Sequence, residues 1–420
     1  MSNTQKKNVP ELRFPGFEGE WEEKKLEDIG TLKNGINKDK ESFGYGFPFV
    51  NLNDVFNSKE IQIKNLSLIN STYKEREEYN LQKGDTLFIR SSVKPSGVGL
   101  TKVIEIDLKN VVFSGFLIRF RNNNLAVNFK KFIFNSISVR KQILSLSSTS
   151  ANTNINQESL KKVKIPIPCM DEQQKIGRFF SKLDRQIELE EQKLELIQQQ
   201  KKCYMQKIFS QELRFKDENG NDYPEWENVM LQKVLKDKTE GIKRGPFGGA
   251  LKKDIFVESG YAVYEQRNAI YDISNFRYYI NENKYKEMQS FSVQPNDIIM
   301  SCSGTIGRLS LIPQNFTKGI INQALIRFRT NHKIRSEFFL IFMRSNQMQR
   351  KILEANPGSA ITNLVPVKEL KLIPFPLPVK FEQDKISQFI LIINRRIEQS
   401  EKKIESLKNR KQGFLQKLFV

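Results

Sequence analysis

Residues of the types that carry out enzymatic chemistry are scarce in this 420-residue sequence. The single histidine, His332, lies in the charged stretch RTNHKIR, so a multi-histidine zinc site is excluded. The cysteines Cys169, Cys203 and Cys302 are scattered without a Cys-x-x-Cys pair, a usage typical of a reduced, cytoplasmic protein. No G-x-x-x-x-G-K-[ST] phosphate loop occurs, which argues against ATP hydrolysis. We therefore expect no catalytic residue, no metal site and no cofactor bound by this chain itself.

Binding chemistry is better represented, in basic loops that also carry amides, glycines and aromatic rings. The loop KTEGIKRGPFGGALKK (238–253) combines glycines, which let backbone amides approach phosphate, with lysine and arginine, which neutralise it. YEQRNAIY (264–271) offers side chains that pair bidentately with adenine or guanine edges. An ordinary solvated charge is the alternative for any single residue. The candidate DNA-contacting residues are Lys33, Lys38, Arg90, Lys94, Lys243, Arg244, Lys252, Gln266, Arg267, Asn268 and Arg308.

The charge balance supports a nucleic-acid partner. The chain has 68 Lys and Arg against 48 Asp and Glu, a formal net charge of +20. Residues 171–209 hold eight basic and seven acidic residues, and residues 381–419 hold nine and five, so most of the excess lies elsewhere. Those other regions are the expected DNA-facing surfaces. No run of about 18 apolar residues occurs, so we expect no membrane partner.

The segments expected to position these loops occur twice in the sequence, as an internal repeat. The segment IPIPCMDEQQKI begins at residue 165 and FPLPVKFEQDKI begins at residue 375, an offset of 210. Aligned without a gap over 45 residues, the two copies share 17 identities. Weaker pairs include ELRF at residues 11 and 212, and GFLIRFR (115–121) with QALIRFR (323–329). The chain therefore consists of two tandem units, each a mixed α/β globular part followed by a long helix.

Each long segment has the apolar 4-3 spacing of a coiled coil. Because 210 is a multiple of seven, the two copies keep one heptad phase. We expect one antiparallel pair with full overlap, in which Glu190 meets Ile404; a one-heptad shift would instead bring Glu190 to Lys411. Two separate amphipathic helices are the alternative. The seam positions are Ile176, Phe180, Leu183, Ile187, Leu194, Ile197, Tyr204 and Ile208 in the first copy, and Ile386, Ile390, Ile393, Ile397, Ile404, Leu407, Phe414 and Leu418 in the second.

In this order and twice over, the motifs resemble the specificity subunits of type I restriction-modification systems. The resemblance covers essentially the whole chain and rests on the doubled Pro-x-Pro helix entries, the ELRF…W heads, GIKRGPFGG, VYEQRNAIY, QPNDIIMSCSGTIGRLSLI and NQALIRFR. It implies an α+β fold with pseudo-two-fold symmetry. Two target recognition domains (1–164 and 211–374) would be joined by central and C-terminal helical regions (165–210 and 375–420), which pair antiparallel as a spacer.

The resemblance also implies the partners. Each recognition domain would read one half of a split double-stranded DNA target. Two modification (methyltransferase) subunits would dock on the chain and restriction subunits would join them, with S-adenosylmethionine, ATP and Mg²⁺ bound by those partners. The first domain departs from the pattern, because NGINKDKESFGYGFPFV replaces the GPFGG loop, so the two domains should read different bases.

Two other classes of function remain open from the residues alone. A free-standing DNA-binding regulator would need no methyltransferase partner. A self-contained methyltransferase or nuclease would need catalytic motifs that the sequence lacks.

Overall fold

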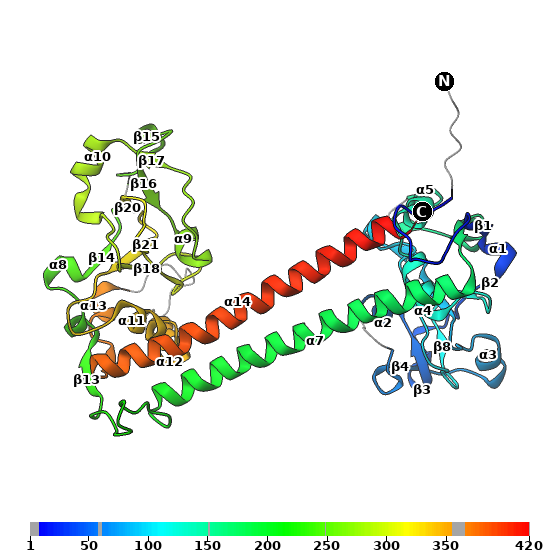
Figure 1. Ribbon diagram of the computed structural model, residues 1–420, viewed down its shortest axis with the longest axis horizontal. Helices are drawn as coiled ribbons and strands as arrows, with labels where there is room; N and C mark the ends of the chain where they lie inside the picture. The colour runs from blue at the N-terminus through cyan, green and yellow to red at the C-terminus, as the bar shows by residue number, and fades with distance from the viewer. Residues whose placement is uncertain (1–7, 58–60, 150–151, 248, 355–365, 420) are drawn as a thin grey trace. The chain divides into compact units, whose positions relative to one another are not determined.

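A computed structural model describes residues 8–57, 61–149, 152–247, 249–354 and 366–419. The chain forms two compact units, shown in Figure 1. Unit 1 comprises residues 1–192 and 401–420, and unit 2 comprises residues 193–400. The long helices α7 (Met170–Phe209) and α14 (Lys380–Lys417) contribute to both units.

The globular part of unit 1 is built from short strands in small sheets. A four-stranded antiparallel sheet has the order β2-β9-β5-β7, and a second sheet, β4-β3-β8, contains the parallel pair β3 and β8. The strands are β1 (Glu22–Lys25), β2 (Thr31–Asn34), β3 (Phe43–Val50), β4 (Ser67–Ile69), β5 (Thr86–Ile89), β6 (Ser91–Ser92), β7 (Thr101–Val103), β8 (Val112–Phe113), β9 (Leu117–Arg121), β10 (Ser148–Thr149), β11 (Thr153–Asn154) and β12 (Lys164–Ile167). The helices are α1 (Leu26–Ile29), α2 (Leu52–Asn57), α3 (Tyr73–Glu78), α4 (Val127–Ile133), α5 (Ile137–Ser145) and α6 (Gln157–Lys161).

Unit 2 repeats this plan. Its sheet β14-β21-β18-β19 matches the first sheet of unit 1 strand for strand, and β15-β17-β16-β20 again contains one parallel pair, β16 and β20. The strands are β13 (Glu227–Met230), β14 (Ile242–Arg244), β15 (Phe256–Val257), β16 (Tyr261–Tyr264), β17 (Tyr279–Ile280), β18 (Ile298–Ser301), β19 (Leu309–Leu311), β20 (Gly319–Ile321), β21 (Leu325–Phe328) and β22 (Pro374–Leu377). The helices are α8 (Lys238–Gly241), α9 (Gln266–Tyr271), α10 (Glu282–Glu287), α11 (Ser336–Met343), α12 (Asn346–Glu354) and α13 (Val367–Leu370).

Each Pro-x-Pro segment is a strand, not a free extended entry to its helix. β12 pairs antiparallel with β1, and β22 pairs with β13. Proline has no N–H to donate, and it is tolerated here because both pairs are isolated two-stranded ribbons. The strand that opens each unit is thus joined to the strand that precedes its long helix.

The apolar segments 128–144 and 336–353 each form two short helices. The breaks fall at Ser136 and Ser345. The Ser136 hydroxyl accepts the Val139 N–H, and the Ser345 hydroxyl accepts the Met348 N–H. A serine in this position favours a new helix start over continuation of the preceding turn.

The long helices pair antiparallel in each unit. In unit 1, Glu190 accepts a hydrogen bond from Lys403, and Lys411 forms an ion pair with Asp184 at 2.5 Å. The Phe179 and Phe414 rings lie 5.1 Å apart in the same unit. These contacts follow the register of full overlap, since Lys403 is the neighbour of Ile404. In unit 2 the Tyr204 and Phe389 rings lie 5.1 Å apart in the same register.

The seam positions lie at or beside the buried cores. Among those of the first copy, Ile176, Phe180, Ile187 and Ile208 are buried, while Leu183, Leu194 and Ile197 are half-buried and Tyr204 is 38% exposed. Among those of the second copy, Ile386, Ile390, Ile393, Ile404, Leu407 and Leu418 are buried, while Ile397 and Phe414 are half-buried. Ile176 and Phe180 share a core with Leu418 in unit 1, and Ile386 and Ile390 share one with Ile208 in unit 2.

Candidate nucleic-acid interface

An ion pair formed by repeated residues fastens each globular part to its long helix. In unit 1, Arg13 of the first ELRF donates through Nε and Nη2 to Glu172, with both distances 2.8 Å. In unit 2, Arg214 of the second ELRF donates to Glu382 at 3.1 and 2.8 Å. Both glutamates are 0% exposed. A buried carboxylate is tolerated because a bidentate guanidinium satisfies it.

The glutamine beside each glutamate makes a second link. The Gln173 amide accepts the Ala126 N–H at 3.0 Å, at the residue that precedes α4. The Gln383 amide accepts the Arg335 N–H at 2.7 Å, at the residue that precedes α11. Each amide also donates to the carbonyl of the second proline in its Pro-x-Pro segment. Part of the repeated sequence therefore encodes an internal joint between helix and globular part.

The joints differ at the tryptophan. The Trp226 indole N–H donates to Glu382 at 2.8 Å, whereas the Trp21 indole N–H has no hydrogen-bond partner among the described residues. Both rings are buried, at 9% and 3% exposure.

A further repeated ion pair lies inside each globular part. Arg121, the last residue of β9, donates to Asp85 at 2.8 and 2.7 Å. Arg329, which follows β21, donates to Asp297 at 2.8 and 2.9 Å. Both aspartates are almost fully buried. These pairs tie two neighbouring strands of the four-stranded sheet together, so the repeated LIRFR motif serves the scaffold.

In unit 1, two of the candidate DNA-contacting residues are held by acids of α3. Lys33 pairs with Glu78 at 2.7 Å, and Lys38 pairs with Glu75 at 2.6 Å. The hydrogen bond from Lys38 lowers the pKa of Glu75. Either lysine would have to leave its carboxylate before it could contact phosphate.

The other two candidates of unit 1 lie beside β5. Half-buried Arg90 donates to the Gly115 carbonyl at 3.4 Å. Exposed Lys94 makes no ion pair with the described residues and lines an open hollow of about 470 Å³. Val93, 81% exposed, and Phe116, 59% exposed, line the same hollow. This surface combines one free positive charge with exposed apolar side chains.

In unit 2, the candidates of the basic loop lie in β14 and in the segment that follows it. Lys243 lies over the Phe291 ring at 4.8 Å, and Arg244 lies over the Phe247 ring at 4.6 Å. Lys252 is exposed. Gly248 of the GPFGG sequence lies outside the described residues.

The candidates in and near α9 divide into free and occupied groups. Asn268 is 2% exposed, and its amide accepts from Glu265 N–H and donates to the Ile273 and Asn275 carbonyls. It closes a turn of the backbone, and because its side chain is buried with both N–H groups used, it is not available to a base. Arg267 is half-buried and Arg308 is exposed, and neither makes an ion pair with the described residues.

Gln266 faces the loop between β18 and β19. Its amide nitrogen is 3.5 Å from the position that a Cβ at Gly304 would take. Gln266 therefore lies beside the loop that also carries Arg308. Among the candidates near α9, Asn268 is the one whose side chain is buried and bonded to the backbone.

Sequence reasoning identified the repeats but missed the partners of the buried residues, because Arg13 and Glu172 are 159 residues apart. The one available signal was that EQ and ELRF are repeated together, in a fixed order. Among the described residues, no cluster of three or more His, Cys, Asp or Glu side chains could hold a metal ion. No helix within the described ranges is long and apolar enough to cross a membrane.

Comparison with known proteins identifies the family. The sequence profile described as "Type I restriction modification DNA specificity domain" matches residues 18–199 and again 247–409. The putative type I restriction enzyme MjaX specificity subunit of Methanocaldococcus jannaschii is 24% identical over 412 residues, which cover 96% of this chain and 93% of that protein. The MjaIX specificity subunit of the same organism is 23% identical, covering 95% and 92%.

Solved structures show the same fold. The type I restriction-modification S subunit from M. genitalium matches with a TM-score of 0.56 and 16% identity, covering 98% of this chain and 99% of that one. A chain from a study of complex assembly and conformational transition in the type I system matches with a TM-score of 0.60 and 15% identity, covering 97% and 98%. The chain therefore belongs to the type I restriction-modification DNA specificity family, and it is a non-catalytic, sequence-specific DNA-recognition subunit.

Proposed function

We propose that each unit reads one half of a split, asymmetric DNA target. The observation that carries this proposal is that the two units share a buried frame and differ on their surfaces. The repeated Asp–Arg and Arg–Glu pairs stabilise both units in the same way. The exposed loops that carry the candidate residues are unlike each other.

The exposed chemistry predicts different half-sites. In unit 1 the free Lys94 adjoins apolar Val93 and Phe116, which suit contact with a thymine methyl group and a neighbouring phosphate. In unit 2, Gln266, Arg267 and Arg308 have side chains that suit hydrogen bonding to purine edges. Lys243, Arg244 and Lys252 then act as phosphate contacts that hold the duplex in register.

The chain is also proposed to dock two copies of a modification subunit, with restriction subunits joining the complex. Two copies of one partner need two similar surfaces. Repeated and exposed residues of the long helices provide them: Arg185 on unit 1 corresponds to Arg395 on unit 2. Glu188, half-buried and 2.8 Å from Arg185, corresponds to exposed Glu398. S-adenosylmethionine, ATP and Mg²⁺ would be bound by these partners.

Mapping methylated bases in a host that carries the modification subunit, with and without this chain, tests the proposal. The expected result is one new methylated motif made of two unlike half-sites separated by unread base pairs. A single continuous motif, or no change in methylation when the chain is added, would contradict it.

A further inference from the structure

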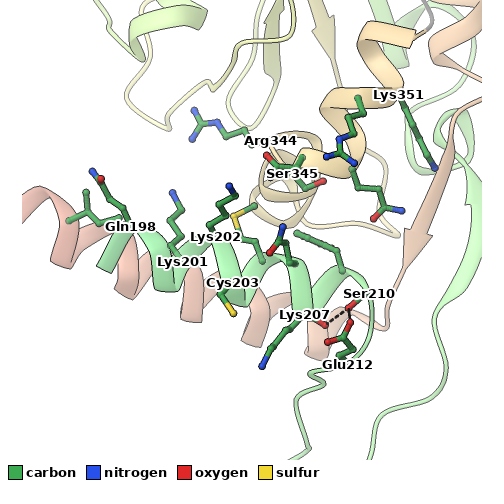
Figure 2. A pocket seen from close by; sticks show the side chains of 17 residues that line it. Gln198, Lys201, Lys202, Cys203, Lys207, Ser210, Glu212, Arg344, Ser345 and Lys351 are labelled. Atoms are coloured by element: carbon green, nitrogen blue, oxygen red, sulfur yellow. Dashed lines mark hydrogen bonds between the residues drawn. The ribbon is translucent and has the colours of Figure 1, made fainter. Parts of the chain in front are cut away.

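Unit 2 contains a large cavity that the function described above does not use. It has a volume of about 1110 Å³ and lies between the C-terminal end of α7 and the junction of α11 with α12. Figure 2 shows Lys201 and Lys202 extending from α7 toward Arg344. Its charged lining consists of Lys201, Lys202, Lys207, Arg344, Arg350, Lys351 and a single acid, Glu212. We call this the basic cavity.

The positive charges of the basic cavity are poorly compensated by the chain. Lys201, Lys202, Arg350 and Lys351 make no ion pair with the described residues, whereas Arg344 pairs with Asp272 at 3.2 Å. Half-buried Lys201 has its pKa lowered by burial and by the nearby charge of Arg344. Holding like charges together in a partly desolvated space costs free energy, which a bound polyanion would recover.

The same place in unit 1 is neutralised. Lys201 corresponds to Lys411 in the repeat, and Lys411 pairs with Asp184 at 2.5 Å. The residue that corresponds to Asp184 is Asn394, so unit 2 lacks the carboxylate. The internal repeat thus provides a natural comparison in which one lysine is paired and its counterpart is not.

Two further differences increase the charge of unit 2. Aligning the two pairs of short helices on their capping residues, Ser136 and Ser345, sets Arg344 opposite Asn135. Lys202 likewise corresponds to Gln412. These two additional charges and the unpaired Lys201 are therefore specific to unit 2.

The basic cavity adjoins the candidate DNA surface of unit 2. Arg344 donates to the Leu309 carbonyl at 2.6 Å, and Gln349 of α12 donates to the Gly307 carbonyl at 2.9 Å. Arg308, the exposed candidate, lies between those two carbonyls in the chain. Phosphates next to a half-site contacted by Arg308 would be adjacent to the cavity.

We propose that the basic cavity binds backbone phosphates of duplex DNA beside the half-site of unit 2, a contact that unit 1 lacks. This inference rests on the proposed function for the location of the duplex. Its consequence is that unit 2 contributes more of the salt-dependent, sequence-independent binding energy than unit 1.

Fluorescence anisotropy of the full-length chain with a labelled duplex, measured across a series of salt concentrations, tests the proposal. The variants are Lys201→Gln, which removes a charge, and Asn394→Asp, which supplies the missing carboxylate. Lys411→Gln is the matched control, since it removes the corresponding lysine of unit 1. Asn394→Asp also separates binding from folding, because the new ion pair should leave thermal stability unchanged or raised.

Each of the two test variants should lower the slope of log affinity against log salt by about 0.9, the value for one lost phosphate contact. At about 0.15 M salt this corresponds to roughly fivefold weaker binding, equal for target and scrambled duplexes. Lys411→Gln should leave the slope unchanged. The proposal is wrong if the slopes of Lys201→Gln and Asn394→Asp match that of the wild type.

The partner and the proposed function can be judged separately. If the two variants keep the wild-type slope but lose the modification subunit in a pull-down, the cavity receives an acidic protein surface and the proposal is wrong. If the wild-type chain does not distinguish target from scrambled duplex, the proposed function fails. The slope comparison still decides the inference in that case, because phosphate contacts do not depend on sequence.

Discussion

Replacing Glu382 with glutamine should weaken the joint of unit 2 more than the corresponding change, Glu172→Gln, weakens that of unit 1. Glu382 accepts two hydrogen bonds from Arg214 and one from the Trp226 indole. Glu172 accepts two from Arg13, and the Trp21 indole does not add a third.

The size of the effect follows from the loss of a buried charged acceptor. Breaking a buried ion pair costs about 3–5 kcal/mol, but the Arg214 side chain is 21% exposed and glutamine keeps one acceptor oxygen. We therefore expect about 3 kcal/mol for Glu382→Gln. Because the joint of unit 1 lacks the indole hydrogen bond, we expect Glu172→Gln to lower the free energy of unfolding by about 1 kcal/mol less than Glu382→Gln does.

The two tryptophans make the assay selective, because each lies at one joint. In a Trp21→Phe background, urea unfolding followed by fluorescence reports Trp226 alone, and in a Trp226→Phe background it reports Trp21. With a denaturant slope of about 3 kcal/mol per molar, Glu382→Gln should lower the Trp226 midpoint by about 1 M. Exposed Glu398 on the same helix is the control position, and Glu398→Gln should shift the midpoint by less than about 0.2 M. An unchanged Trp226 midpoint in Glu382→Gln would refute the role given to the buried glutamate.

Three further predictions concern burial and backbone packing. Burial lowers the pKa of Lys130 to about 8, so the unfolded chain binds more protons than the folded chain between about pH 8 and 10.5. The free energy of unfolding should therefore rise with pH across that window, by roughly 3 kcal/mol at most. In urea titrations at several pH values, Lys130→Met should remove that part of the rise. Ile390→Ala should lower the free energy of unfolding by about 2–5 kcal/mol because Ile390 is 1% exposed. Leu391→Ala, at a residue that is 46% exposed, should lower it by less than about 1 kcal/mol. Equal urea midpoints for the two variants would show that the seam does not support the fold. Gly245→Ala should unfold or distort β14, since the new Cβ would lie 1.8 Å from the Asn322 carbonyl oxygen. In the control Gly413→Ala the new Cβ meets nothing within 4 Å, so this variant should keep the wild-type circular dichroism spectrum and urea midpoint. A folded Gly245→Ala variant with wild-type DNA binding would contradict this.

The periodic parts of the fold were accessible from sequence. The heptad spacing predicted two long helices, and the constant offset of 210 predicted a single register for both. The α+β organisation and the tandem repeat are confirmed by the family match and by the structures of relatives. Full overlap followed from burying the most apolar surface, and the contact of Glu190 with Lys403 agrees with it.

Tertiary partners were not accessible in the same way. Lys33 and Lys38 look like free charges in sequence, yet acids of α3 more than 30 residues later pair with them. Asn268 lies in an exposed-looking polar stretch, yet its amide is used by the backbone around it. A charge or an amide has no periodicity, so its availability depends on neighbours that only the folded chain supplies.

The most direct test of separate half-site reading is a map of methylated sites made with variants of one unit at a time. Val93→Ser with Lys94→Gln changes unit 1, and Arg267→Gln with Arg308→Gln changes unit 2. Each pair should relax or shift the bases of one half-site only, with the other half-site and the number of unread base pairs unchanged. Altered bases in both halves from changes confined to one unit, or an unchanged motif in both variants, would contradict separate reading by the two units.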